Sequence, residues 1–455
     1  MPTMTYPEAL RAIEALKPGG MKWGLARMQR ILALCGSPER RLRCVHIAGT
    51  NGKGSTARMI QSILTAAGWR TGLYASPAVT GLRDTITMDG QPIPEAAFAS
   101  LTAELLSHDG EMGQAGRLSE FELTTALAFL YFARSRTDLC VIECGLGGRD
   151  DATNALPPPL AAVLTPVSLD HTAVLGGTVA EIAENKCGIL KPPCAVITSP
   201  AQDPEALAVL MEQAARRGLT VRIPARSGKV LEETLGRTAF TYDGMTITLP
   251  LTGGFQRDNA LTAIETVRAL APAGFSADGE AIRRGLAAAA MPCRQEALSL
   301  SPLVLLDGAH NPQGVAALAE TLRRHRLSGL TLVAGMLRDK DAACCAALLA
   351  PFCRRAICCT PPNPRALPAA QFAKLLHAAA PGLPVEAVDD PSAALDAALG
   401  DTAGPERVSA PEAGGAGLLV AGSFYVAAAL RPRLLAWLGK GGGTGMPGGH
   451  GAAGE

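Results

Sequence analysis

The stretch Ala48-Gly49-Thr50-Asn51-Gly52-Lys53-Gly54-Ser55-Thr56 follows a short apolar run, Cys44 to Ile47, and precedes a helix-like segment from Ala57 to Ala67. This order predicts a phosphate-binding loop between a strand and a helix, because glycines turn backbone N–H groups toward an anion and the helix N-terminus adds positive potential. Lys53 can reach the β- and γ-phosphates, and a hydroxyl after it can bind Mg²⁺. The spacing departs from G-x-x-x-x-G-K-[ST], so a glycine-rich turn without nucleotide is the alternative. We expect a bound nucleoside triphosphate.

The composition indicates a multidomain globular protein without a strong overall charge. The chain has 455 residues, 48% of them hydrophobic, which is enough for more than one core. Lys and Arg number 42 against 41 Asp and Glu, a formal net charge of +1. No overall field therefore favours nucleic acid or an anionic membrane, and neither is expected as a partner. Any anion binding must be local.

The cysteines and the N-terminus indicate a cytoplasmic protein. The twelve cysteines include the pairs Cys344-Cys345 and Cys358-Cys359, but no C-x-x-C and no His/Cys cluster at zinc spacing. We expect reduced, mostly buried thiols. Met1 to Lys17 lacks the apolar core of a signal peptide, and no run approaches the ~18 apolar residues that span a bilayer.

Strand-length apolar runs alternate with helical stretches, which predicts a parallel sheet flanked by helices. The expected strands are Leu139–Glu143, Ala161–Thr165 and Ala195–Thr198, and the expected helices Glu122–Phe132, Thr178–Cys187, Asp258–Leu270 and Gly279–Ala289. Two alternating runs around Asp243-Gly244 predict a small β-hairpin.

The alternation restarts after Met291-Pro292, which predicts a second unit. Its expected elements are the strands Leu303–Leu306, Leu330–Ala334 and Gly417–Ala421 and the helix Gln313–Arg324, with residues 400–416 as a surface insertion. The fold class is thus α/β: a P-loop-type parallel-sheet ATP-binding domain over 1–292, a smaller Rossmann-like domain over 293–438, and a Gly-rich disordered tail over 439–455.

Polar residues follow the expected strands of the first domain. Glu143 closes an apolar strand, and Asp170-His171 comes shortly after the next one. Ligand-binding groups gather at the carboxyl ends of parallel strands, and a carboxylate there is a good Mg²⁺ ligand. The alternatives are that Glu143 pairs with Arg149 and that His171 is structural.

Three further sites are less explicit in the sequence. Lys186 ends an amphipathic helix, where a solvated lysine that complements the helix dipole is the ordinary interpretation. Asp307-Gly308-Ala309-His310-Asn311 places a carboxylate, an imidazole and an amide in one loop after a strand. Arg294, just past the domain boundary, can reach a triphosphate or be a surface residue. The charged loop Gly335–Asp341 is typical of a solvated turn.

In this order, the segments resemble the folylpolyglutamate synthase/dihydrofolate synthase family of the Mur ligase superfamily. The resemblance extends over residues 20–430 and rests on the order and spacing of its motifs. They are Gly24-Leu25-Ala26-Arg27, the Gly49–Ser55 loop, Tyr74-Ala75-Ser76-Pro77, Ser119-Glu120-Phe121-Glu122, Glu143–Asn154, Ser168–Thr172, Lys186–Ile189, Asp307–Pro312 and Gly422-Ser423-Phe424-Tyr425.

The resemblance implies an ATP-dependent acid–amino-acid ligase. ATP would phosphorylate a folate carboxylate, and the amine of L-glutamate would displace phosphate to form an amide. The acceptor would be dihydropteroate, tetrahydrofolate or both. The resemblance also implies two Mg²⁺ ions, with K⁺ as a further candidate, and a monomer.

The resemblance also implies the role of each site residue. ATP would be held by Thr50, Asn51, Gly52, Lys53, Gly54, Ser55, Asn259, Arg294 and Asp307, the last three from the domain interface. Metal would be held by Ser76, Glu143, His171 and Lys186. Folate would contact Lys22, Trp23, Gly24, Leu25, Ser119, Glu120, Phe121, Glu122, Asp150, Asp151 and Ala152. Lys53, Lys186 and His310 would be catalytic, with Lys186 carbamylated and supporting the second Mg²⁺.

The chain departs from the family pattern at three positions. Ala78 stands where the family usually has histidine, Asp150 where it often has leucine, and Asn185 where it often has glutamate. The metal ligands survive these changes, whereas the extra carboxylate at Asp150 could disfavour one folate form.

Two other functions remain open from the sequence. A Mur-type ligase could act on another carboxylate such as a cell-wall precursor, although the roughly 45 residues before the loop strand are few for the additional domain expected there. A non-catalytic nucleotide-binding protein would explain Lys53, but not Glu143, His171 and Lys186 together.

Overall fold

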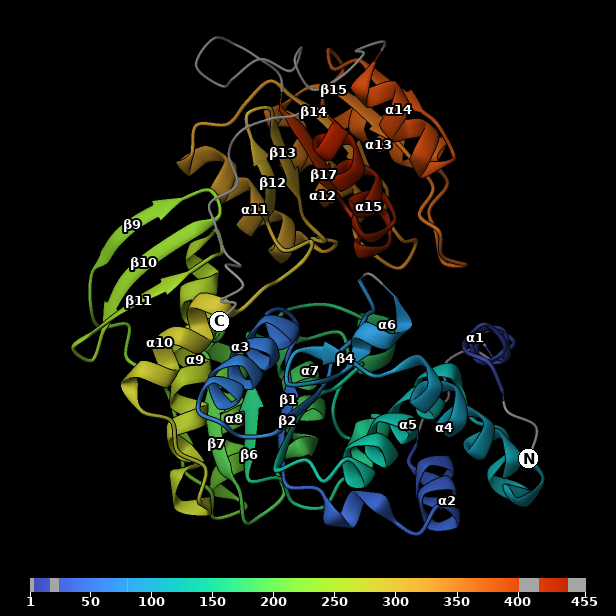
Figure 1. The fold of residues 1–455 in the computed structure, drawn as a ribbon. Coiled ribbons are helices and arrows are strands. Elements are labelled where there is room, and N and C mark those ends of the chain that lie inside the picture. Colours follow the sequence, from blue (N-terminus) through green and yellow to red (C-terminus); the bar gives the residue numbers. More distant parts are fainter. Residues whose placement is uncertain (1–3, 17–23, 80, 401–416, 441–455) are drawn as a thin grey trace, which may run out of the picture. The chain divides into compact units, whose positions relative to one another are not determined.

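The computed structural model describes residues 4–16, 24–79, 81–400 and 417–440. The chain divides into two compact units, Met1–Pro292 and Cys293–Glu455, each built on its own large sheet (Figure 1). Lys22 and Trp23, two of the expected folate contacts, lie outside the described residues, as do 401–416 and 441–455.

The first unit contains an eight-stranded sheet with the order β4-β3-β2-β5-β1-β6-β7-β8. Its strands are β1 (Cys44–Ala48), β2 (Thr71–Tyr74), β3 (Ile86–Met88), β4 (Gln91–Pro92), β5 (Leu139–Glu143), β6 (Ala161–Leu164), β7 (Ala195–Thr198) and β8 (Val221–Arg222). The neighbouring strands β2, β5, β1, β6, β7 and β8 pair in parallel, and β3 and β4 extend the β2 edge as antiparallel strands. The predicted parallel sheet is confirmed, with β1 and its phosphate loop at its centre.

Helices cover both faces of this sheet (Figure 1). They are α1 (Tyr6–Glu14), α2 (Ala26–Leu34), α3 (Lys53–Ala66), α4 (Glu95–Ser107), α5 (Glu120–Arg134), α6 (Thr172–Leu175), α7 (Val179–Lys186), α8 (Pro204–Ala215), α9 (Gly254–Ala269) and α10 (Gly279–Ala288). Because side chains alternate along a strand, Val45 and Ile47 of β1 pack with α3, α9 and α10, whereas Cys44 packs with α1, α2, α4 and α5. The sheet is therefore the middle layer of three.

The helix after the phosphate loop begins at Lys53, four residues earlier than the apolar pattern predicts. Gly52 precedes it with a φ of 85°, and the first helical bond runs from Thr56 N–H to the Gly52 carbonyl. The sequence pattern misses this turn because Lys53 to Thr56 carry no apolar periodicity. The early start places Lys53, Gly54 and Ser55 in the first turn of α3.

The predicted hairpin forms, and a third strand extends it. β10 (Arg237–Tyr242) and β11 (Met245–Leu249) pair antiparallel, and β9 (Val230–Thr234) adds to β10. β9 is mostly exposed and contains two consecutive glutamates, so it lacks the period-two pattern that identifies a half-buried strand.

The second unit contains a six-stranded sheet with the order β12-β13-β17-β14-β15-β16. Its strands are β12 (Glu296–Leu300), β13 (Leu303–Leu306), β14 (Leu330–Ala334), β15 (Cys353–Cys358), β16 (Val385–Ala387) and β17 (Leu418–Ala421), and its helices α11 (Pro312–Arg324), α12 (Ala342–Leu349), α13 (Ala369–Ala379), α14 (Pro391–Leu399) and α15 (Phe424–Lys440). β12 pairs antiparallel with β13, and the other pairings are parallel. The last strand, β17, lies inside the sheet between β13 and β14.

The C-terminal helix runs slightly further than the sequence indicates. The Gly-rich tail is predicted from residue 439, but α15 continues through Gly439 to Lys440. One glycine costs a helix only ~1 kcal/mol relative to alanine, so it does not by itself end one. Among the described helices, none has both the length and the apolar character of a membrane span.

The close approach of α10 to α3 depends on Gly285. A Cβ atom at this position would collide with the backbone of Ser62 and Ile63, and the Ser62 hydroxyl donates to the Gly285 carbonyl at 2.6 Å. Backbone atoms cannot move aside as a flexible side chain can.

We therefore expect Gly285→Ala to reduce the free energy of unfolding of the first unit by about 1–3 kcal/mol, the usual cost of overpacking. Gly254→Ala, at an open position in α9, is the matched control and should be neutral or stabilising. Calorimetric melting of both variants measures the difference, and equal melting temperatures would contradict the packing argument.

Candidate functional site

Three strand ends of the first unit meet beside the phosphate loop. β1 lies between β5 and β6, with Ile47 in register with Glu143 and Ala48 with Leu164. The loops that leave these strands contain Gly49–Gly52, the Glu143 region and Asp170-His171. The parallel register therefore brings together three segments that are far apart in the chain.

The shape of the phosphate loop requires glycine at two positions. Gly49 has a φ of 151° and faces Thr165, with which a Cβ atom would collide. At Gly52, where φ is 85°, a Cβ would lie 2.5 Å from Asn259 Oδ1. Asn259, an expected ATP contact on α9, is thus packed directly on the loop.

The loop is tied to the segment after β6. Thr50 N–H and Asn51 N–H both donate to the Pro166 carbonyl, at 2.9 and 3.2 Å. The Thr50 hydroxyl donates to the Ser168 carbonyl and accepts from Ser168 N–H, both at 3.1 Å. The N–H groups of Thr50 and Asn51, which are expected to bind the triphosphate, thus donate to a protein carbonyl instead. The N–H groups of Lys53 to Ser55 lie in the first turn of α3, where the helix itself offers no acceptor.

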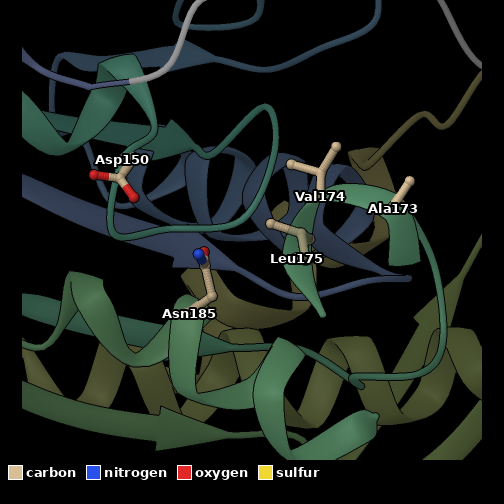
Figure 2. Close-up of a pocket in the computed structure, with 5 residues that line it drawn as sticks. All are labelled: Asp150, Ala173, Val174, Leu175 and Asn185. Carbon is tan, nitrogen blue, oxygen red and sulfur yellow. The ribbon is translucent and has the colours of Figure 1, made fainter. Parts of the chain in front are cut away.

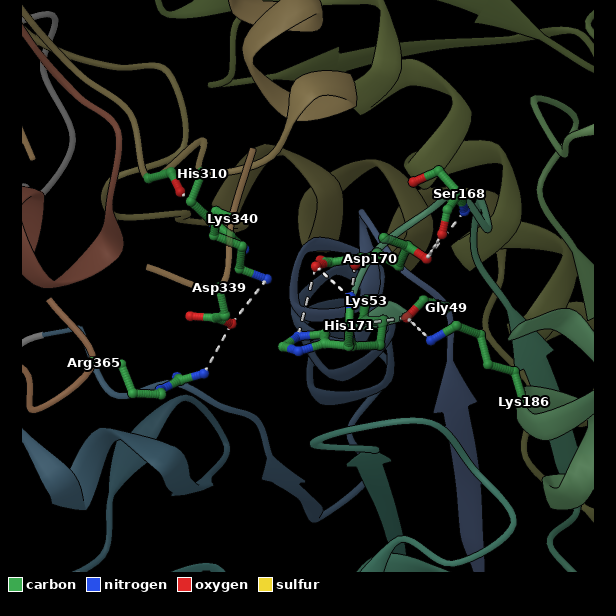
Figure 3. A network of polar contacts seen from close by, with 12 residues as sticks. Gly49, Lys53, Ser168, Asp170, His171, Lys186, His310, Asp339, Lys340 and Arg365 are labelled. Atoms are coloured by element: carbon green, nitrogen blue, oxygen red, sulfur yellow. Dashed lines mark hydrogen bonds and ion pairs between the residues drawn. The ribbon is translucent and has the colours of Figure 1, made fainter. Parts of the chain in front are cut away.

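Two lysines donate to the same carbonyl of this loop (Figure 3). Lys53 Nζ is 3.1 Å from the Gly49 and Thr50 carbonyl oxygens, and Lys186 Nζ is 2.8 Å from the Gly49 oxygen. Lys186 is only 4% exposed, so the interpretation as a solvated lysine is wrong. Burial, and then the charge of Lys53, lowers the pKa of Lys186 to about 7.

Glu143 lies buried at the end of β5, against the first turn of α3. Its Oε2 accepts from Ser76 N–H at 3.2 Å, and a Cβ at Gly54 would lie 3.3 Å from the same oxygen. Arg149, the alternative partner, pairs instead with Glu184 at 3.3 Å. The carboxylate is therefore at the phosphate loop, beside Ser76.

His171 is positioned by its own loop. It has a left-handed backbone, φ 52°, immediately before α6, and its Nε2 lies 3.8 Å from Asp170 Oδ1. Within the described residues, no group of three or more His, Cys, Asp or Glu side chains is arranged so that it could hold a metal ion. Mg²⁺ typically binds through one or two carboxylates and completes its shell with phosphate oxygens and water, so Glu143 with Ser76 fits such an ion.

Several expected folate residues serve the fold directly. Ser119 and Glu122 form a capping box at the start of α5, and the buried Glu122 carboxylate also accepts from Arg27 Nε at 2.8 Å. Phe121 fills the space beside Gly145 and contacts Tyr74, with ring centroids 6.1 Å apart. Glu120 starts α5, Gly24 has a φ of 94°, and Leu25 precedes α2.

Asp150 and Asp151 are neighbours in very different surroundings. Asp151 is buried and accepts from Leu146 N–H at 2.7 Å and Thr153 N–H at 3.0 Å, and burial raises its pKa. It holds the turn that contains the buried Ala152. Asp150 is exposed and lines an open cleft of about 320 Å³ with Asn185 and the side chains of α6 (Figure 2). Of the two carboxylates, only Asp150 faces this cleft.

Asn185 lines this cleft and directly precedes the buried Lys186 in the chain. Its Oδ1 accepts from Gly148 N–H at 3.1 Å, and its backbone carbonyl accepts from Arg149 N–H at 3.0 Å. Sequence reasoning noted Asn185 only as a departure from the family pattern. Its contacts with the glycine turn after β5 depend on tertiary structure.

In the second unit, Asp307 is buried at the end of β13. It accepts from Gln295 N–H at 3.0 Å and from Ala309 N–H at 2.5 Å. Burial raises its pKa to about 6, with Arg294 opposing the shift. His310 Nδ1 lies 2.8 Å from the Gly308 carbonyl, an interaction that places the proton on Nδ1. Asp307 and His310 thus share one tightly bonded loop.

The chain matches two parts of one known family. The Mur ligase middle domain matches residues 47–267, and the Mur ligase glutamate ligase domain matches residues 293–424. The folylpolyglutamate synthase of Lacticaseibacillus casei is 34% identical over 444 residues, which are 95% of this chain and 99% of the relative. The dihydrofolate synthase/folylpolyglutamate synthase of Escherichia coli is 32% identical over 425 residues, 92% of this chain and 93% of the relative.

A solved structure supports the same relationship. The Mycobacterium tuberculosis folylpolyglutamate synthase complexed with ADP superposes with a TM-score of 0.83 at 32% identity, over 94% of this chain and 98% of that chain. The match extends across both units, so sequence and fold indicate one family.

The buried Asp307 predicts a pH dependence of stability. Its folded pKa of about 6 lies above its ordinary value of 3.8, so between these values the folded protein holds a proton that the unfolded chain has lost. Unfolding then releases a proton, and stability falls as the pH rises through this window, by up to about 3 kcal/mol. The measured quantity is the melting temperature of the second unit in the wild type minus that in Asp307→Asn. This difference should be smaller at pH 7 than at pH 4.5.

The comparison uses the change with pH, because the side-chain amide of the Asp307→Asn variant cannot accept both backbone hydrogen bonds at any pH. Asp390→Asn, at an exposed helix cap, serves as the control. Parallel melting curves of wild type and Asp307→Asn across pH 4–7 would show that Asp307 does not titrate as described.

Proposed function

The chain belongs to the Mur ligase family and, within it, to the folylpolyglutamate and dihydrofolate synthases, and we propose that it joins L-glutamate to dihydropteroate, to tetrahydrofolate or to both, with conversion of ATP to ADP and phosphate. The Escherichia coli relative carries both synthase names, which supports a bifunctional enzyme.

One observation carries the proposal: the amines of Lys53 and Lys186 converge on the Gly49 carbonyl. Burial and the charge of Lys53 lower the pKa of Lys186 to about 7, so Lys53 supplies the lasting positive charge at this loop. The helix N-terminus formed by Lys53 to Ser55 adds further positive potential at the same place. A transferring phosphoryl group supplies the matching negative charge, and its reaction depends mainly on positioning and charge stabilisation.

The reaction solves a leaving-group problem. A carboxylate oxygen of the folate attacks the γ-phosphorus, the bond to the bridging oxygen breaks, and ADP leaves. The glutamate nitrogen then attacks the acyl carbon, phosphate leaves as the C–O bond breaks, and the nitrogen loses a proton to give the amide. Lys53 and the first turn of α3 orient the phosphates, and Asn259 restrains the loop through Gly52. His310 and Asp307 stay predictions as glutamate-side and ATP-side groups.

Mg²⁺ would be held by Glu143 and Ser76, with His171 and a modified Lys186 as the further ligands that the family implies. When bound, the ion would neutralise phosphate charge and polarise the phosphoryl group. K⁺ and a second Mg²⁺ remain part of the proposal, as does a monomeric state.

Lys186 has the properties that carbamylation requires. With a pKa of about 7, much of its amine is neutral at physiological pH. The neutral nitrogen attacks the carbon of CO₂, a C–N bond forms, and a proton is lost, which turns a cation into a carboxylate-like group. This change also removes the repulsion between Lys186 and Lys53. A non-catalytic nucleotide-binding protein would give no reason to bury Lys186 here.

The substrate assay tests the function. Purified protein with ATP, Mg²⁺ and L-glutamate should release phosphate when dihydropteroate or tetrahydrofolate is added, and comparison of the two decides bifunctionality. Lys53→Ala should reduce the rate at least ~100-fold, because it removes a charge at the transferring phosphoryl group. Absence of stimulation by either pterin would overturn the proposal.

Lys186→Ala tests the carbamate. We expect a loss of about 100-fold or more in kcat and a partial recovery with added formate or acetate, which replace the missing carboxylate. Wild-type activity should also depend on added bicarbonate, with faster activation at pH 8 than at pH 6, because a larger fraction of the reactive amine is neutral above its pKa of about 7 than below it.

Lys191→Ala is the matched control for this experiment. Lys191 is also partly buried and donates to the Asn154 and Leu156 carbonyls, both at 2.6 Å. Its loss should lower stability without any rescue by carboxylates. A Lys186→Ala protein that kept the full rate would refute the assigned role.

A further inference from the structure

Phe424 is the first residue of α15 and is 5% exposed. It follows β17 in the segment Gly422-Ser423-Phe424-Tyr425, to which no ligand role is assigned above. Aromatic side chains at helix starts commonly serve as core packing. The surroundings of this ring differ from those of an ordinary core residue.

Two separate segments of the second unit converge on the Phe424 ring. The Arg294 guanidinium carbon lies 3.8 Å from the ring centroid. A Cβ at Gly308 would lie 2.5 Å from two ring carbons, so this glycine permits the close approach. The His310 ring centroid is 6.0 Å away, at an interplanar angle of 59°. The ring thus touches the segment before β12 and the loop after β13.

The backbone around the ring is also bonded together. Gly308 N–H donates to the Cys293 carbonyl at 2.7 Å, and Asp307 N–H donates to the Val420 carbonyl of β17 at 2.9 Å. These bonds fix the segments before Arg294 and around Asp307, whose carboxylate interacts electrostatically with Arg294. An arginine has many rotamers, and ordering it costs conformational entropy.

We propose that Phe424 is a positioning residue that holds Arg294, by a cation–π contact, in the orientation in which it binds ATP, and that also borders His310. A guanidinium that lies on a ring by its face has its N–H donors in its own plane, the direction from which a phosphate can accept them. The inference rests on the proposed function, because it takes Arg294 as a nucleotide contact.

The second unit offers a matched control. Phe352 carries a similar cation–π contact with Arg323, with the guanidinium carbon 5.7 Å from the ring centroid, and is 7% exposed. Phe352→Leu therefore makes the same chemical change at a buried ring that is not part of the Arg294 and Asp307 segments.

The experiment measures the affinity for Mg-ADP by calorimetry and the KM for ATP, with melting temperatures for every variant. Phe424→Leu should weaken ADP binding and raise the KM for ATP by roughly fivefold, and Phe424→Tyr, which keeps the ring, should stay near wild type. Phe352→Leu should change both values less than about twofold. In an Arg294→Met background, which has no cation to place over the ring, Phe424→Leu should have no further effect on either value beyond about twofold, because the two residues act as one unit.

Two results would overturn the inference. ADP affinity could be unchanged in Phe424→Leu, or the loss could be equally large in the Arg294→Met background, which would indicate ordinary packing. If Phe424→Leu does not fold, Phe424→Met, which keeps more of the side-chain length, is read by the same criteria. Failure of pterin-stimulated turnover would reject the proposed function and leave the ADP comparison interpretable.

Discussion

The arrangement of the first unit depends on one crowded carbonyl, that of Gly49. Two lysines donate to it, and the chain can present it only because Gly49 has no side chain where Thr165 approaches. The parallel strands supply this geometry, because β5 and β6 flank β1 and deliver Glu143 and the Pro166 carbonyl beside the loop. Lys53 and the N-terminus of α3 thus provide a local positive potential in a chain whose net charge is +1.

Many of the site's polar groups also hold the fold together. Glu122 caps α5 and binds Arg27, Asp151 closes the turn before Thr153, and Asp307 receives two backbone N–H groups. A buried carboxylate without partners would be costly, so these bonds are what allow charge to be kept near a ligand site. Resemblance to a family identifies such residues as functional, but the contacts show that several act by fixing loops. Asp150 is different, because it is exposed at the cleft.

The two units follow the same construction. Each places an acidic group at the carboxyl end of a strand that has a parallel neighbour: Glu143 is the last residue of β5, and Asp307 directly follows β13. In each, glycine admits a close neighbour: Gly52 accommodates Asn259, and Gly308 accommodates Phe424. The loops are therefore shaped by packing against side chains that are distant in sequence.

Local pattern alone determined the strands β5, β7, β13 and β14, the helices that cover them and the strand–loop–helix order around Gly49–Ser55, because apolar periodicity and glycine spacing are properties of neighbouring residues. It missed β9 and the early start of α3, where exposed or polar residues carry no periodic signal. Only the tertiary structure decided that Lys186 is buried beside Lys53, that Thr50 and Asn51 donate to Pro166, and that Arg294 stacks on Phe424. These contacts join residues far apart in the chain, and the pKa, burial and orientation of a side chain depend on what the fold packs around it.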